Sequence, residues 1–286
     1  MNFYLGCAVW SYKDWVGNLY PPKSQPRDFL NLYSRRFTTV EGNTTFYAVP
    51  STDTINKWVA QTPCGFKFCP KLPRQITHQG LLTPRIAEAS SFLSRMSELG
   101  DRLGTTFIQL PPSYSPEYLA DLKEFLTVCS ELNLSLALEV RHLDWFDAAY
   151  RDRLNCLLAE LNIARVLLDT RPIYNCPDDP QLNSQRRKPQ VPLQPIISGD
   201  VGFVRFISHP NRQYNQSYLQ QWVDYVNQWL SLGKTIYFFV HCPQEVRSPD
   251  TAKYFHSLLE KSAVNKGAFK LPWNDLTPQP TQLNLF

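Results

Sequence analysis

The chain has 286 residues, of which 43% are hydrophobic and 13% aromatic, and its formal net charge is +4. This length allows one large α/β domain, because barrels of that class typically fill about 250 residues, and the apolar fraction can build a sizeable core. The mild positive charge permits an anionic partner without demanding one, since nucleic-acid binders usually carry a clustered basic face.

Seven cysteines are scattered along the chain, and none forms a Cys-x-x-Cys pair. This odd, dispersed set favours reduced thiols in the cytoplasm over a disulfide framework or a zinc site. The opening residues Met1-Asn2-Phe3-Tyr4 lack the charged start of a signal peptide. No window approaches about 18 uncharged apolar residues, as a membrane span would require. We therefore expect a cytoplasmic protein with no membrane partner.

Short apolar, β-branched or aromatic runs predict eight strands. They lie at about 3–10, 38–46, 66–72, 105–110, 135–141, 164–169, 202–208 and 235–241. Segments with helical spacing separate most of them. They cover 28–37, 51–61, 84–99, 116–132, 148–161, 217–232 and 251–263. Ser51 begins a typical N-cap region, and Pro84 suits the first turn of its helix.

Strands that alternate with helices predict a parallel sheet with right-handed crossovers, and eight strands can close a barrel. We therefore expect an α/β fold, a (β/α)8 TIM-type barrel, that forms a single domain over residues 1–268. A doubly wound open sheet is the alternative.

Two segments break this rhythm. Residues 171–200 are rich in proline and contain Arg186-Arg187-Lys188 at the place of a sixth helix. They predict a long loop over one barrel end that replaces or distorts helix 6. Residues 272–282 cannot continue a helix, so we expect an extended linker within a flexible tail over 269–286.

Alternation along the strands predicts which side chains face the interior. In the run 136–141 the aliphatic residues should face the helices, so the others point inward. The same reasoning gives inward positions on seven strands: Thr39, Glu41, Asn43; Lys67, Cys69, Lys71; Thr105, Phe107, Gln109; Ala137, Glu139, Arg141; Leu167, Asp169; Phe203, Arg205, Ile207; and Tyr237, Phe239, His241.

The inward residues nearest the carboxyl ends are mostly polar, and active sites of barrels lie at that end. Burying an unpaired charge costs several kcal/mol, so such a set indicates either a mutually paired network or a functional pocket. We expect Glu41, Glu139, Asp169 and His241 to be catalytic, as acids and bases. We expect Lys71, Arg141 and Arg205, with Asn43 and Gln109, to bind a phosphate or carboxylate.

Aromatic side chains follow the same strand ends. Trp10, Phe46 and His142 could stack on a base or sugar ring beside the cations, or simply pack in the core. The chain has five histidines, of which three lie near strand ends. We therefore predict no cofactor and no metal site, and dependence on a divalent metal is the less favoured alternative.

Several motifs in these regions occur in one order along the chain. They are Gly6-Cys7-Ala8-Val9-Trp10-Ser11-Tyr12-Lys13-Asp14-Trp15, Tyr20-Pro21-Pro22, Val40-Glu41-Gly42-Asn43-Thr44-Thr45-Phe46-Tyr47, Phe66-Lys67-Phe68 with Lys71, Phe107-Ile108-Gln109-Leu110-Pro111-Pro112, Glu139-Val140-Arg141-His142 with Trp145, and Asp169. Over residues 3–265 the chain resembles the YecE-like family, also called domain of unknown function 72. The resemblance implies a barrel with a cleft at the strand ends and supplies no activity.

The last residues printed are Gln282-Leu283-Asn284-Leu285-Phe286. They resemble the bacterial sliding-clamp-binding motif, in which Gln282, Leu283, Leu285 and Phe286 would fill a groove on the clamp. Burial of such side chains stabilises a complex by about 1.5–3 kcal/mol each. A tail that packs on its own domain is the alternative.

The leading hypothesis is an enzyme with hydrolase- or isomerase-type acid/base chemistry on an anionic substrate. That substrate would be a phosphate-bearing small molecule or a nucleic acid, and the tail would recruit the protein to the replication clamp. Two other hypotheses stay open. One is a carbohydrate-processing barrel, because two carboxylates on adjacent strands would suit glycoside hydrolysis. The other is a non-catalytic, clamp-associated adaptor.

Overall fold

The protein, represented by a computed structural model, is described here for residues 2–184, 187–262 and 271–272. It has an α/β fold in which all strand pairs are parallel. The strands are β1 Phe3–Cys7, β2 Thr39–Gly42, β3 Lys67–Pro70, β4 Thr106–Gln109, β5 Leu136–Glu139, β6 Ala164–Asp169, β7 Val201–Ile207 and β8 Thr235–His241.

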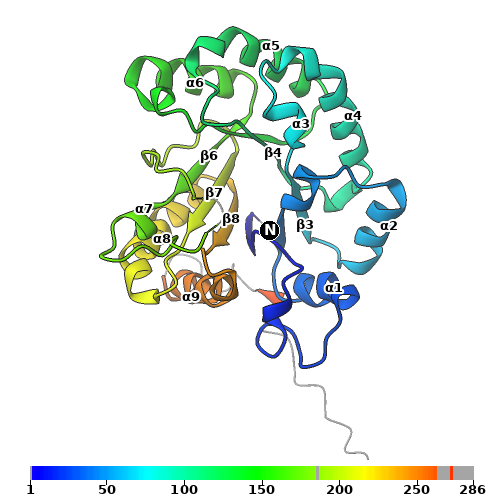
Figure 1. Cartoon of the computed structure of the whole chain (residues 1–286), viewed down its shortest axis with the longest axis vertical. Helices are drawn as coiled ribbons and strands as arrows, with labels where there is room; N and C mark the ends of the chain where they lie inside the picture. The colour runs from blue at the N-terminus through cyan, green and yellow to red at the C-terminus, as the bar shows by residue number, and fades with distance from the viewer. Residues whose placement is uncertain (1, 185–186, 263–270, 273–286) are drawn as a thin grey trace, which may run out of the picture.

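The strands curl around a common interior, with the helices outside them (Figure 1). One sheet has the order β1-β8-β7-β6-β5-β4, and a second pairs β2 with β3. Isolated contacts join the two sheets: the Thr38 N–H donates to Leu5 O at 3.2 Å, and Lys71 forms a bridge with Phe107. In the described part of the chain, the eight strands therefore lie in two curled parallel sheets that contact each other at these points, and they do not form one continuous eight-stranded sheet. We call this arrangement the strand ring.

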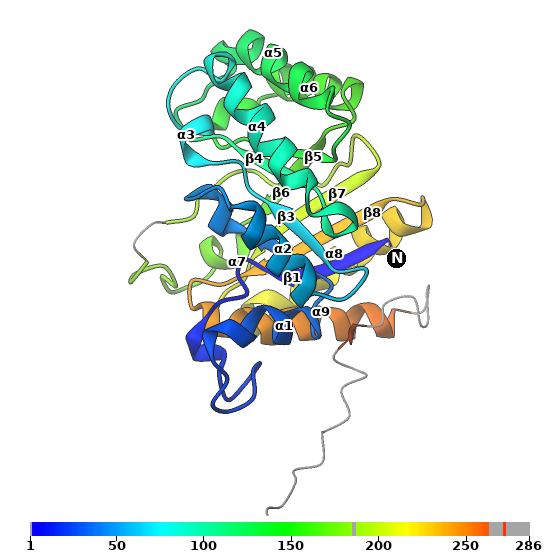
Figure 2. The same ribbon diagram turned by 90° about the vertical axis from the view of Figure 1, so that its right-hand side faces the viewer.

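The predicted helices are present, mostly with shorter bounds. They are α1 Phe29–Ser34, α2 Thr52–Gln61, α4 Ile86–Ser97, α5 Leu119–Ser130, α6 Ala148–Glu160, α8 Gln216–Ser231 and α9 Ser248–Lys261. Ser51 caps α2 by accepting from the Thr54 N–H, and Pro84 lies in the 3-10 turn that leads into α4. Helix α9 lies along β1 and β8 (Figure 2). Among the residues described, no helix is long and apolar enough to cross a bilayer.

Two apolar clusters separate the inside of the strand ring from its outside. The inner cluster contains Cys69, Phe107, Ala137, Ala164, Val166, Phe203, Tyr237 and Phe239. The alternate residues of the same strands, such as Ile108, Leu138 and Phe238, belong to the larger cluster that the helices cover. This alternation confirms the predicted inward faces of β3, β4, β5, β7 and β8.

The predicted face of β6 is wrong. In the register with β7, Val166 pairs with Phe203 and Leu168 with Arg205, and paired residues of a parallel sheet share a face. Leu167 and Asp169 consequently point outward, toward the helices. The strand is buried on both faces, so its apolar residues give no alternation from which the phase could be derived.

Glycine permits close contact between β1 and β2. A Cβ on Gly6 would lie 2.0 Å from the backbone oxygen of Thr39. No side chain fits at that distance, so the approach of these two strands depends on glycine at this position.

The sixth helix is reduced to the single turn α7, Arg171–Tyr174. The described residues between α7 and β7 contain no regular helix. The long loop predicted over 171–200 is thus confirmed in its described part. A further single-turn helix, α3 Arg74–Thr77, follows β3 where none was predicted.

Candidate anion-binding site at the strand ends

Three buried charged side chains meet inside the strand ring. Arg205 donates from Nε to Glu41 Oε2 at 2.8 Å and from Nη2 to Glu41 Oε1 at 2.9 Å. Its Nη1 also donates to Glu139 Oε2. Glu41 is 0% exposed, Glu139 1% and Arg205 3%. One guanidinium from β7 therefore neutralises carboxylates from β2 and β5 together.

Two polar side chains extend this network at Glu41. Asn43 donates from Nδ2 to Glu41 Oε1 at 2.7 Å and to the Ala8 oxygen at 2.9 Å. The Nε2 of His241 lies 2.8 Å from Glu41 Oε2. Both residues were predicted site members, and the structure brings them to the same carboxylate.

Electrostatics keep these carboxylates ionised. Burial alone would raise the pKa of Glu41. The attraction of Arg205, and after it that of His241, is stronger than this effect and holds the pKa well below its ordinary value. Burial likewise opposes ionisation of Glu139, and Arg141 and Arg205 lower its pKa to about 2. Burial lowers the pKa of His241 to about 4 despite the attraction of Glu41. At neutral pH the imidazole is therefore neutral and donates its Nε2 proton to Glu41.

A second layer of polar groups lies nearer the solvent. Arg141 donates from Nε to Glu139 Oε1 at 2.6 Å and from Nη2 to Gln109 Oε1 at 2.6 Å. Lys71 Nζ donates to the same amide oxygen at 2.8 Å. The Gln109 side chain thus holds Lys71 and Arg141 close together. Each of these two cations has further N–H groups that can donate to a ligand.

This second layer borders a cavity of 430 Å³. Six of its lining residues are basic: Lys71, Arg74, Arg141, Arg187, Lys188 and Arg205. Its other lining residues are Val9, Asn43, Phe46, Tyr47, His78 and Gln109. No carboxylate lines the cavity in the described part of the chain, so the cavity favours an anion. We call this cavity and its lining the mouth.

Four mouth residues come from segments that sequence reasoning left out of the site. Arg74 and His78 lie on and just after α3, which was not predicted. Arg187 and Lys188 belong to the basic run noted in the long loop, but their place over the strand ends depends on tertiary contacts. Tyr174 donates its hydroxyl proton to the Lys188 oxygen, and Gln181 Oε1 accepts from the Lys188 N–H at 2.7 Å.

Two predicted binding residues lie outside the mouth. The Trp10 ring packs edge-on against Trp58, with ring centroids 5.3 Å apart, and against Phe68. Strand β1 ends at Cys7, so alternation does not extend to Trp10. His142 caps the turn Leu143–Phe146 by accepting from the Asp144 N–H at 3.3 Å.

Asp169 is the third predicted residue that the structure separates from the site. It faces the helices, where its Oδ2 accepts from Trp222 Nε1 at 2.8 Å. Arg171 donates to both of its carboxylate oxygens, from Nε at 2.9 Å and from Nη2 at 2.8 Å. Asp169 therefore fixes α7 and α8 to the end of β6. The adjacent carboxylate pair expected from Glu139 and Asp169 does not form.

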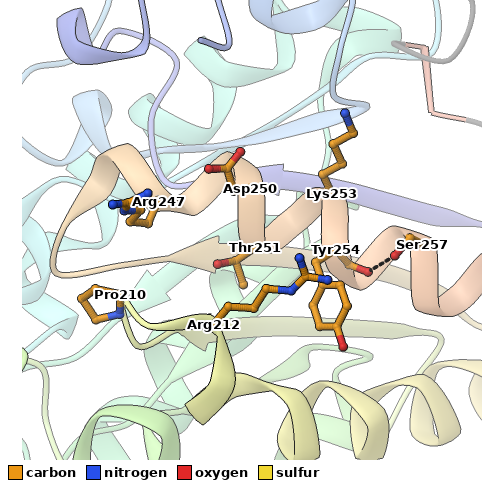
Figure 3. A pocket seen from close by; sticks show the side chains of 8 residues that line it. All are labelled: Pro210, Arg212, Arg247, Asp250, Thr251, Lys253, Tyr254 and Ser257. Carbon is orange, nitrogen blue, oxygen red and sulfur yellow. Dashed lines mark hydrogen bonds between the residues drawn. The ribbon is translucent and has the colours of Figure 1, made fainter.

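A second cavity, of 460 Å³, lies on the outer flank between α9 and the segment after β7 (Figure 3). There the guanidinium carbon of Arg212 lies 3.5 Å from the centroid of the Tyr254 ring. Arg247, Asp250 and Lys253 also line this groove. Because it carries both charge signs and lies away from the buried network, we place the candidate site in the mouth.

Cys176, Asp178 and His209 could hold a metal ion, since their ligand atoms lie within 4.8 Å of one another. The Nδ1 of His209 accepts from the Asn211 N–H at 2.8 Å, so its proton lies on Nε2 and is donated to Asp178 Oδ1 at 3.0 Å. A metal on Nε2 would have to displace this proton while Nδ1 stayed an acceptor. That arrangement differs from the usual metal-bound histidine, whose other ring nitrogen donates.

The fold and mouth together define a parallel α/β protein with a cationic pocket at the carboxyl ends of its strands. The chain belongs to the family described as "Protein of unknown function DUF72", whose sequence profile matches residues 4–276. It is 32% identical to UPF0759 protein YecE of Escherichia coli K12 over 269 residues, which cover 93% of this chain and 95% of that protein.

Other relatives agree with this assignment. UPF0759 protein YunF of Bacillus subtilis is 24% identical, with 99% of both chains covered. A crystal structure of a DUF72 family protein from Enterococcus faecalis has a TM-score of 0.68 at 18% identity and covers 91% of this chain and 98% of that one. A DUF72 family protein from Thermotoga maritima has a TM-score of 0.66 at 22% identity, with 91% and 100% covered. At such identities the solved structures support the fold alone.

Proposed function

We propose that this protein is an enzyme that binds a small phosphate- or carboxylate-bearing substrate in the mouth. The observation that carries the proposal is the lining of the 430 Å³ cavity, which combines six basic side chains with no carboxylate among the described residues. Guanidinium and ammonium groups bind such anions through short, charge-assisted hydrogen bonds. A nucleotide end of a nucleic acid carries the same chemistry.

Three of these cations have no carboxylate partner among the residues described: Lys71, Arg74 and Lys188. The others pair with Glu41, Glu139 or Asp179. A fully paired network with no cavity would have favoured the adaptor hypothesis. Open space beside unpaired cations favours ligand binding instead.

The buried carboxylates suit an electrostatic role better than proton transfer. The pKa of Glu139 is about 2, and that of Glu41 is well below its ordinary value. A general acid needs a pKa near the working pH, which neither group has. We therefore propose that Glu41 and Glu139 fix Arg205 and balance the mouth's charge. The carbohydrate hypothesis loses its main support, because it requires a carboxylic acid with a raised pKa at the site, and Glu245, whose pKa burial raises to about 8, does not line the mouth.

A ligand screen with matched variants tests the proposal. The wild type should be stabilised by sugar phosphates, nucleotides or small carboxylates, and hits should then be assayed for turnover. Lys188→Gln and Arg74→Gln should each weaken binding by about tenfold, which is the loss expected from one charge-assisted hydrogen bond of about 1.5 kcal/mol. Arg212→Gln, in the outer groove, is the control. Equal weakening by all three changes, or no binding by the wild type, would contradict the proposal.

We also propose that Gln282, Leu283, Leu285 and Phe286 recruit the protein to a bacterial sliding clamp. These residues lie outside the described part of the chain, so the support is the sequence motif. Immobilised clamp should retain the wild type and lose a chain truncated after Thr281. Equal recovery of both proteins would end the idea.

We infer that the strand ring is a (β/α)8 barrel whose sheet is interrupted at two places and that residues 1–268 form one domain. Its support is the sheet order, which follows the chain from β4 to β8 and returns to β1. A cytoplasmic location is our proposal as well. All seven cysteines are free thiols, which suits a reducing compartment.

A further inference from the structure

We propose that Lys71 is a nucleophilic amine that forms a Schiff base with the carbonyl group of an anionic aldehyde or ketone bound in the mouth. This inference rests on the proposed anion site and adds a substrate class to it. In this inference Lys71 reacts with the substrate, whereas in the proposed anion site it only binds the substrate through its charge.

The backbone of Lys71 is held firmly at the end of β3. Its N–H donates to Thr45 Oγ1 at 2.9 Å, and that hydroxyl donates to the Lys71 oxygen at 2.7 Å. A bridge to Phe107 fixes the other side. The side chain therefore starts from a defined point and reaches the cavity with little freedom, as a nucleophile must.

The ammonium group of Lys71 is largely removed from water, because the residue is only 6% exposed. Its Nζ lies over the rings of Phe46 and Phe107, 3.8 Å and 5.7 Å from their centroids, and these ring faces offset only part of the lost hydration. Among the described residues, Nζ donates one hydrogen bond, to Gln109. An ammonium group can donate three.

The cations around Lys71 lower its pKa in the same direction as its burial, and two carboxylates oppose them. Burial and then Arg205 lower the pKa of Lys71 to about 7, although Glu139 and Glu41 raise it. A substantial fraction of the amine is then unprotonated at neutral pH, which is the nucleophilic form. Charged or titratable residues face the amine from several elements: Glu41 on β2, Arg74 and His78 on and after α3, Glu139 and Arg141 at β5, Lys188 in the loop, and Arg205 on β7.

The chemistry needs no oxidant or reductant. The Nζ lone pair attacks the carbonyl carbon, and one amine proton passes to the carbonyl oxygen, which gives a carbinolamine. That hydroxyl leaves as water with the second amine proton, and a carbon–nitrogen double bond forms. Arg74 and Lys188 are placed to hold the phosphate or carboxylate of the same molecule, because both line the cavity that Lys71 borders.

Borohydride trapping with glycolaldehyde phosphate tests the inference. Hydride reduces the imine to a stable secondary amine, which peptide mapping by mass spectrometry locates. Lys71 should be labelled at least about tenfold faster than Lys67, and an excess of inorganic phosphate should suppress the labelling. Neutral glycolaldehyde, which lacks the anion, should label Lys71 more slowly than the phosphate ester does.

Lys67 is a matched control because it lies on the same strand but its Nζ donates to the Asp101 oxygen at the opposite end. Lys71→Arg keeps the positive charge and should lose the adduct, whereas Lys67→Arg should keep it. The wild type gives an independent readout that needs no variant. Its Lys71 labelling rate should level off above about pH 8, while exposed lysines should continue to speed up toward about pH 10.

The outcomes separate the two proposals. Phosphate binding in the mouth without preferential Lys71 labelling overturns the Schiff base and leaves the anion site standing. Loss of both binding and labelling overturns both. Labelling that rises with pH at the same rate for Lys71 and the exposed lysines also contradicts the inference.

Discussion

Arg205 decides whether the buried carboxylates can stay ionised, because it alone bonds to both Glu41 and Glu139 among the described residues. Replacing it with methionine keeps much of the volume, leaves buried Glu41 without its main partner and leaves Glu139 with Arg141 as its remaining ion-pair partner. Breaking a buried pair in this way typically costs about 3–5 kcal/mol. We expect Arg205→Met to lose about that much unfolding free energy in urea at neutral pH, and to regain part of it near pH 5.

The control for Arg205→Met is Arg27→Met, an arginine whose side chain is 86% exposed. It should change the unfolding free energy by less than about 0.5 kcal/mol. Comparable losses in the two variants would show that the buried network does not stabilise the fold as described.

His241 makes a second prediction, on pH. Its pKa is lowered from 6.5 to about 4 in the folded state, so the unfolded chain takes up a proton first as the pH falls. The contribution of neutral His241 is complete above pH 6.5 and is lost as the pH falls through the folded pKa. Asn cannot titrate, yet it can still donate to Glu41.

The difference in unfolding free energy between wild type and His241→Asn should therefore decrease steadily from about pH 7 to about pH 4. Chemical denaturation across this range measures it. Taking the difference removes the other groups that titrate in both proteins, including Glu245, whose pKa burial raises to about 8. If the difference in unfolding free energy does not change with pH, the His241 imidazole is not buried and neutral in the folded protein.

At the scale of residues, the alternation of side chains along single strands predicted most of the candidate site. Where one face of a strand is apolar and the other carries polar residues near its end, as in Leu136–Glu139, the phase can be derived from sequence. Asp169 could not be placed, because Val166, Leu167 and Leu168 are all apolar and both faces of β6 are buried. Lys188 was also out of reach, since its position depends on the path of a long loop.

At the scale of elements, the approach of β1 to β2 depends on the missing side chain of Gly6. A methyl group there would lie 2.0 Å from the Thr39 oxygen, so the strands must move apart. Overpacking in a core typically costs about 1–3 kcal/mol, and here the obstacle is backbone. We expect Gly6→Ala to lower the unfolding free energy by about 3 kcal/mol, measured in urea.

Asn2→Ala, at an exposed position just before β1, is the control and should be nearly neutral. A Gly6→Ala protein as stable as the wild type would mean that the two strands are farther apart than described. The sequence indicated eight strands and most helices, but it overextended β1 and β2. The residues that follow these two strands leave the sheet and contribute to the mouth. The strand pattern in the sequence does not show where the extended backbone stops.

At the scale of the whole molecule, the strand ring collects groups that are far apart in sequence. Glu41 and Arg205 are 164 positions apart, and Glu41 and His241 are 200 positions apart. Such contacts form only once strands from both sheets are in place, so the cationic mouth depends on the whole strand ring. The outer groove of Figure 3 needs only neighbouring elements and serves as the natural comparison for ligand binding.

The most direct test of the central claim is a crystal structure of the wild type soaked with tungstate, an anomalously scattering analogue of phosphate. The account predicts an anomalous peak in the mouth, within hydrogen-bonding distance of at least two of Lys71, Arg74, Arg141 and Lys188. A peak confined to the outer groove around Arg212, or none at all at millimolar tungstate, would contradict it.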